Sequence, residues 1–180
     1  MKPIALFVLL AAVLAGCSTS KRPLPTVAKV DLARYSGRWF EVARLPNSFQ
    51  RAGALATADY TARPDGTVKV INTEFSTDRS PKTVEGSASA VAGSGNARLR
   101  VKFGGLAALA PMPAEGNYWI LALAPDYSAA LVGTPDRKFL WLLTRTQNPS
   151  AATRQRMIQR AAGLGFPTEK LLTADWSKRP

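Results

Sequence analysis

Histidine is absent from the 180-residue sequence, and cysteine occurs once, at Cys17. Without histidine the chain cannot form a Ser-His-Asp or Cys-His catalytic site or hold a metal ion through imidazole. A single cysteine cannot close a disulfide bond within the chain. CxxC pairs, the phosphate-binding loop GxxxxGK and the dinucleotide motif GxGxxG are missing as well. We therefore predict no catalytic residue, no metal site and no cofactor.

Acidic residues are few compared with basic ones: 12 Asp and Glu stand against 24 Lys and Arg, giving a formal net charge of +12. A basic surface favours contact with anionic membranes or nucleic acid. The export signal described next argues against nucleic acid as a partner. Two interpretations stay open, a membrane-facing surface and an ordinary solvated basic surface.

The first 17 residues, MKPIALFVLLAAVLAGC, have the features of an export signal. A positive start at Lys2 precedes an apolar run over residues 4–14 that is too short to span a bilayer comfortably. The following Leu-Ala-Gly-Cys resembles the lipobox of bacterial lipoproteins, in which cleavage before the cysteine leaves that residue lipidated. The alternative is an ordinary secretory signal with a chance cysteine. We predict that residues 1–16 are removed and that Cys17 is lipidated.

The resemblance to lipoproteins implies several fatty acyl chains on Cys17, such as palmitate, and more than one chain makes anchoring stable. Ser18 follows the cysteine where an aspartate would retain the protein at the inner membrane. The predicted location is therefore the outer membrane, lipid-anchored and facing the periplasm. Residues 17–30 are polar and contain prolines, so they are predicted to form a lipidated tether.

Eight short segments then alternate between apolar and polar residues or are rich in β-branched residues. Turn signals such as Pro64-Asp65-Gly66 separate them. Short connections favour an antiparallel meander, and closure into a barrel removes the exposed edges. The sequence therefore predicts an all-β fold, an eight-stranded antiparallel up-and-down β-barrel. Its strands are residues 38–45, 55–63, 67–75, 82–91, 97–103, 118–124, 129–133 and 138–146.

The spacing of apolar residues changes after residue 149. Ser150 can cap a helix, and the apolar residues that follow recur at helical spacing up to Gly163. Pro167 confirms the stop. We predict one C-terminal α-helix packed on the outside of the barrel, in a single domain of residues 31–176 with a tail of residues 177–180.

Three motifs resemble the signatures of the lipocalin family. They are GRWFEVAR at residues 37–44, PDYSAALV at residues 125–132 and FLWLLTR at residues 139–145. The resemblance runs over about residues 31–176 and is to the group that contains bacterial outer-membrane lipocalins and apolipoprotein D. It implies that Trp39 plugs the closed end of the barrel and that Arg145 packs over its indole. It also implies that Gly37 lets the chain pass close across the base.

Side-chain alternation then predicts the lining of the barrel, because every second residue before Arg145 shares its inward direction. The resemblance also places Tyr118, Ile120 and Ala122 inward and Trp119 outward, under the helix. An apolar lining with a few hydroxyl groups suits a fatty acid or a lysophospholipid. The predicted ligand-binding residues are Ala56, Ala58, Tyr60, Leu99, Val101, Phe103, Tyr118, Ile120, Phe139 and Trp141.

These predictions favour a membrane-anchored lipocalin that binds, stores or transports lipophilic ligands in the bacterial envelope, and not an enzyme. Two alternatives stay open: a structural envelope adaptor with a filled barrel, and a lipid-modifying enzyme that uses inward-pointing acids. The candidate acids are Glu41, Asp59, Glu74 and Glu85. Arg51 and Lys82 are predicted near the mouth, as partners of a ligand headgroup or as solvated charges. Residues 104–113 are predicted to form a lid or a membrane-contact lip, and a homodimer is left open.

Overall fold

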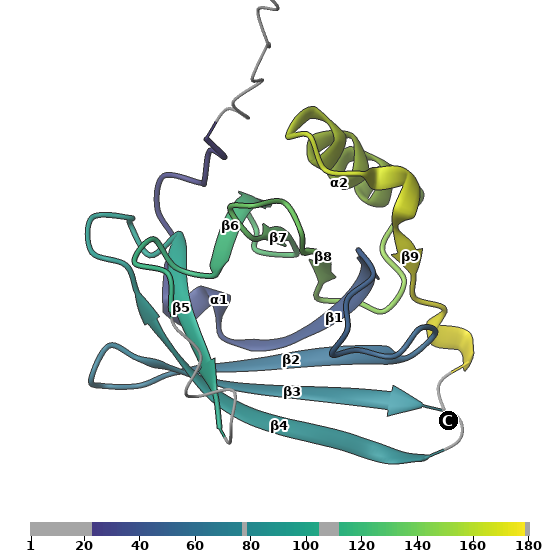
Figure 1. The fold of residues 1–180 in the computed structure, drawn as a ribbon, viewed down its shortest axis with the longest axis horizontal. Helices are drawn as coiled ribbons and strands as arrows, with labels where there is room; N and C mark the ends of the chain where they lie inside the picture. The colour runs from purple at the N-terminus through teal and green to yellow at the C-terminus, as the bar shows by residue number, and fades with distance from the viewer. Residues whose placement is uncertain (1–22, 77–78, 105–111, 179–180) are drawn as a thin grey trace, which may run out of the picture.

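The computed structural model describes residues 23–76, 79–104 and 112–178. Eight strands close into an antiparallel barrel, since each strand pairs with the next and β1 pairs with both β8 and β2 (Figure 1). The predicted fold class is confirmed. The strands are β1 (Gly37–Arg44), β2 (Leu55–Ala62), β3 (Val68–Ser76), β4 (Arg79–Ala90), β5 (Arg98–Phe103), β6 (Tyr118–Leu123), β7 (Ala129–Gly133) and β8 (Leu140–Thr144).

The predicted helix is α2 (Ala151–Gly163), and it lies outside the ring of strands (Figure 1). The Ser150 hydroxyl accepts a hydrogen bond from the backbone N–H of Thr153 at 3.2 Å, as a helix N-cap does. Four short elements were not predicted, because one turn or two residues leave no periodic signal. They are α1 (Leu32–Tyr35), η2 (Thr168–Lys170), β9 (Leu172–Thr173) and η3 (Trp176–Lys178).

The buried apolar residues form two clusters on opposite faces of the strands. The outer cluster joins α2 to the outside of the barrel and includes Met157, Ala161, Leu131 and Leu142. The inner cluster lies on the inward faces of the strands and includes Trp39, which is fully buried. Strand alternation therefore divides the sequence between two cores, as predicted for a helix packed on a barrel.

A β-bulge in β6 overturns the predicted direction of Ala122. The register moves from Ile120 opposite Val132 to Ala122 opposite Leu131, so the partner strand advances one residue while β6 advances two. This extra residue reverses the alternation that follows it. Ala122 consequently packs against the outer cluster, and Leu123 packs against the inner one.

The segment before α1 packs against the barrel from Leu24 to Val30, although it was predicted to belong to a tether. Both of these residues are buried. The backbone N–H of Val27 donates to the carbonyl of Ile120 at 3.0 Å, and that of Val30 donates to Gly95 at 2.8 Å. The first part of the predicted tether, Cys17 included, lies outside the described residues. At the other end, η3 extends into the predicted tail.

In the part of the chain that the structure describes, none of the helices has the length and apolar character needed to cross a membrane.

Candidate functional site

The closed end of the barrel is sealed by one cation on one indole. The Cζ atom of Arg145 lies 3.8 Å from the ring centroid of Trp39. The guanidinium also donates hydrogen bonds of 2.9 Å to three backbone carbonyls, those of Arg34, Ser36 and Arg38. A guanidinium held in this way fixes the chain around α1 to the base of the barrel. We assign this pair a structural role.

Gly37 allows the close approach of Arg145 to β1. Its φ angle is +93°, in the region that favours glycine, and a Cβ atom there would lie 3.4 Å from a guanidinium nitrogen of Arg145. Two residues later, the indole N–H of Trp39 donates to the carbonyl of Tyr35 at 2.8 Å. The first residues of the GRWFEVAR motif therefore provide both the positive φ angle at Gly37 and the indole of Trp39 that closes the barrel.

Three tyrosines form a polar floor above this plug. The hydroxyl of Tyr118 lies 2.8 Å from that of Tyr35 and 3.1 Å from that of Tyr60. The ring of Tyr35 packs on Trp39 with 4.9 Å between centroids. Burial raises the pKa of Tyr60 to about 12, and burial also raises the pKa of Tyr35 and of Tyr118. The floor is thus neutral at physiological pH and offers hydroxyl groups to whatever lies above it.

Alkaline pH is expected to destabilise the fold through this floor. The pKa of Tyr60 is about 12 in the folded chain and about 10 when unfolded, so the folded state keeps a proton that the unfolded state has lost. The free energy of unfolding therefore falls as pH rises from about 10 to about 12, by roughly 2–3 kcal/mol from this residue. Urea unfolding across that range should show a smaller fall for Tyr60→Phe. An equal fall in the variant would contradict the assignment.

The mouth of the barrel contains a buried ion pair. A guanidinium nitrogen of Arg44 lies 2.7 Å from a carboxylate oxygen of Glu41, and the two side chains are 3 % and 4 % exposed. Burial raises the pKa of Glu41, while Arg44 and a hydrogen bond from Gln50 limit that rise. Arg44 also donates to the carbonyls of Ala54 and Arg51. The pair therefore ties the loop of residues 45–54 to the top of β1.

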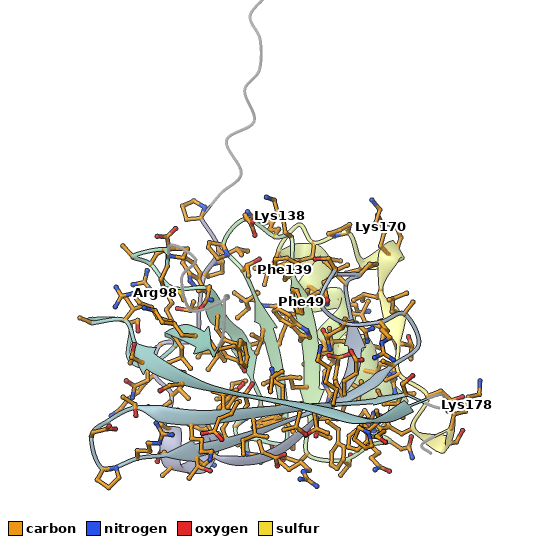
Figure 2. The ribbon with its side chains drawn as sticks, turned by 60° about the horizontal axis from the view of Figure 1, so that its bottom comes forward. Phe49, Arg98, Lys138, Phe139, Lys170 and Lys178 are labelled. Carbon is orange, nitrogen blue, oxygen red and sulfur yellow. The ribbon has the colours of Figure 1, made fainter. Side chains whose placement is uncertain are left out.

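A group of aromatic rings is linked to this ion pair through Gln50, whose side-chain N–H donates to Glu41. The indole N–H of Trp141 donates to the side-chain carbonyl of Gln50 at 3.1 Å. Phe139 stacks on Trp141 with 6.0 Å between centroids, and Phe49 lies 5.3 Å from Phe139 (Figure 2). Phe49 is 58 % exposed. The mouth therefore combines a neutralised charge pair with an apolar rim.

Most of the predicted lining residues gather in the inner cluster. Ala56 and Phe139 are placed differently: Ala56 is buried opposite Glu74, and Phe139 belongs to the aromatic group at the mouth. Trp119 lies in the outer cluster, the outward direction expected of it. The residues in or against the inner cluster are Ala58, Tyr60, Leu99, Val101, Phe103, Tyr118, Ile120 and Trp141.

Comparison with known proteins decides the family. Residues 30–175 match the family model of the lipocalin-like domain. The chain belongs to the lipocalin family. It is 37 % identical to temperature-induced lipocalin-1 of Arabidopsis thaliana over 164 residues, which cover 90 % of this chain and 88 % of that protein. It is 36 % identical to outer membrane lipoprotein Blc of Escherichia coli K12 over 168 residues, 92 % of this chain and 89 % of that one.

The solved structure of insecticyanin from Manduca sexta has the same fold as this lipocalin. The TM-score is 0.63 at 19 % identity, covering 85 % of this chain and 84 % of that one. Lipocalins are typically binding proteins rather than enzymes. The wall of the barrel is therefore the place to look for a ligand site.

The inner face of β4 in this lipocalin is exposed to solvent at Val84. Val84 has the same strand parity as Ala88 of the inner cluster, yet it is 40 % exposed. Its partner in the register is Asn72, whose buried side-chain oxygen has no hydrogen-bond partner among the described residues. Val84 is therefore an inward side chain that water reaches, and it lies beside a buried acceptor that the protein itself does not satisfy. Sequence parity pointed to both positions, but neither was selected.

Of the four acids considered for a catalytic role, two lie on the outer face of the barrel and two on the inner face. Asp59 and Glu85 lie on the outer face, where they pair with Arg38 at 2.8 Å and Lys69 at 3.0 Å. Glu41 and Glu74 point into the barrel by strand alternation, but each is paired with an arginine. Glu74 accepts from the backbone N–H of Arg51 at 3.2 Å and lies 3.6 Å from its guanidinium.

Of the two predicted headgroup cations, Arg51 is thus engaged with Glu74. Lys82 is exposed and lies opposite Glu74 in the register of β3 and β4. The predicted lid, residues 104–113, lies largely outside the described residues. Gln50 and Phe49 were not selected, because a loop without periodicity gives no signal for the direction of a side chain.

Proposed function

We propose that this lipocalin binds a lipophilic ligand inside its barrel while anchored to the outer membrane through a lipidated Cys17. The observation that supports binding is the solvent-exposed inner wall at Val84 above an apolar lining and a tyrosine floor. Apolar area removed from water provides the driving force, at about 25 cal/mol per Å². The name of the relative, outer membrane lipoprotein Blc, supports the location.

The chemistry of the wall favours a fatty acid or a lysophospholipid. Its lower part offers apolar side chains and hydroxyl groups, and its mouth offers Gln50, Asn72 and the exposed Lys82. An amphiphile would place its chain toward the floor and its headgroup among these polar groups. The carboxylates inside the barrel are held by arginines, which favours binding over acid–base chemistry.

A charge on the inner wall is expected to weaken binding. Val84→Asp places a carboxylate where the ligand chain would pass, and the lost apolar contact of about 1.5 kcal/mol or more corresponds to at least about tenfold weaker binding of oleate. Binding is measured by quenching of tryptophan fluorescence in the delipidated full chain. Val84 is already 40 % exposed, so the variant should keep its stability.

Thr83→Asp is the matched control, since residue 83 is exposed on the opposite face of the same strand. It should bind oleate and lysophosphatidylcholine as the parent chain does. Equal affinities of the two variants would show that the ligand does not pass Val84, and no binding by the parent chain would argue for a filled adaptor barrel. Lipidation is tested separately by the mass of the N-terminal peptide.

A further inference from the structure

The start of the described chain lies at the open rim of the barrel. Val30 is bonded to Gly95, in the turn between β4 and β5 at the closed end. Three residues before it, Val27 bonds to Ile120, which is itself bonded to Ala97 beside that turn, and Leu24 is buried in the outer cluster. Figure 2 shows the described chain beginning at the same edge as Lys138 and Lys170. The segment therefore points the N-terminus toward the mouth.

The same rim presents an apolar side chain among basic ones. Phe49 is 58 % exposed in the loop of residues 45–54. This loop lies beside residues 134–139, because Leu45 donates to the carbonyl of Leu140 at 3.0 Å. Lys138 and Lys170 are exposed along this edge (Figure 2). Acidic side chains offset part of this charge, since Asp136 lies 3.6 Å from Lys138 and the exposed Glu169 precedes Lys170 in η2.

The distance from the rim to the predicted anchor is short. Cys17 precedes Pro23 by six residues. Even fully extended, six residues span only about 20 Å. Lipid chains on Cys17 would therefore hold the rim close to the bilayer, where an anionic surface attracts lysines and the interface accepts an exposed phenylalanine.

We infer that the open rim of the barrel, with Phe49, Lys138 and Lys170, is a docking surface for the anionic lipid membrane in which the chain is anchored. The mouth then faces the bilayer, so a lipid can pass between membrane and barrel without crossing water. The inference rests on the proposed lipidation of Cys17. It adds an orientation and a contact surface, which a lipid anchor on a freely tumbling barrel would not have.

Energy transfer from two ends of the barrel tests the orientation. The lipidated full chain carries a donor dye on Ser48→Cys at the rim or on Pro64→Cys in the exposed turn between β2 and β3 at the closed end. It is reconstituted in phosphatidylglycerol–phosphatidylcholine vesicles with an acceptor on the lipid headgroups. Transfer from Ser48→Cys should be several-fold more efficient. Equal or reversed efficiencies overturn the inference.

Variants of the rim separate docking from the effect of the tether. Phe49→Ser with Lys138→Glu and Lys170→Glu should abolish most of the difference between the two dyes. Lys178→Glu, which reverses a charge at another edge (Figure 2), should leave it intact. A difference that persists in the rim variant would mean that the tether alone orients the barrel, which overturns the docking surface.

Flotation of the same vesicles distinguishes the two proposals. If the parent chain does not float with the vesicles, the proposed lipid anchor fails, and the orientation falls with it. If the chain floats but the two dyes transfer equally, the anchor stands and only the docking surface fails. The two outcomes therefore distinguish a failure of the lipid anchor from a failure of the docking surface.

Discussion

Replacing Trp39 with alanine is expected to lower the free energy of unfolding by about 3–5 kcal/mol. The indole is fully buried, so its removal leaves a cavity at the closed end. The change also takes away the surface on which Arg145 lies at 3.8 Å and the N–H that donates to Tyr35. Urea unfolding followed by far-ultraviolet circular dichroism measures the loss.

Phe49→Ala provides the control for the loss of an aromatic ring. Because Phe49 is 58 % exposed, its removal should change the free energy of unfolding by no more than about 0.5 kcal/mol. Arg145→Met should cost less in the Trp39→Ala background than in the parent chain, since the two side chains act together. A loss below about 1 kcal/mol for Trp39→Ala would show that the plug does not hold the closed end.

Replacing Arg44 with methionine is expected to destabilise the chain by a similar amount, about 3–5 kcal/mol, because it leaves the carboxylate of Glu41 buried without its cation. The carbonyls of Ala54 and Arg51 lose their donor at the same time. The loop of residues 45–54 should then open more readily and release oleate faster. Urea unfolding and stopped-flow fluorescence measure the two effects.

The pH dependence of the stability of Arg44→Met shows whether the buried carboxylate of Glu41 causes the loss. Burial already raises the pKa of Glu41, and loss of the cation raises it further. The folded state then binds a proton more tightly than the unfolded state, so stability is highest in acid and falls as pH rises through the folded pKa. The double variant Glu41→Gln with Arg44→Met removes the buried charge and should recover part of the loss at neutral pH.

Arg38→Met is the matched control, since it removes an arginine from an exposed ion pair. The side chains of Arg38 and Asp59 are 57 % and 26 % exposed, and such pairs contribute about 0–1 kcal/mol. Equal losses for Arg38→Met and Arg44→Met would contradict the special role of the buried pair.

Residues whose role follows from a motif or from strand alternation could be predicted from the sequence. Trp39 and Arg145 were placed by their motifs, and Leu99 and Val101 by the alternation of β5. Ala122 was misplaced because YWILALA is apolar throughout, and such a run does not show where a bulge inserts its extra residue. A run that is apolar throughout predicts a strand, but it does not show which of its residues point into the barrel.

The N-terminal segment was underestimated for a different reason. Its prolines and lysine suggested a linker, although Leu24, Val27 and Val30 recur three residues apart. That spacing suits an extended chain with three residues per turn, which can lay one side on a barrel. The ion pair of Glu41 and Arg44 also escaped prediction, because the bulge between them in β1 sets their contact.

The hydrogen-bond ladder of the barrel determines where two copies of this chain could associate through strands. β1 is bonded to both β8 and β2, so neither of its edges is free for a second chain along the barrel. β4 spans Arg79–Ala90, but in the described residues it pairs with β5 only over Gly86–Ala90, and Gly104 adds one hydrogen bond to Glu85. Residues 79–84 therefore have a partner strand on one side alone, and this half of β4 is where another molecule can extend the sheet with a strand of its own.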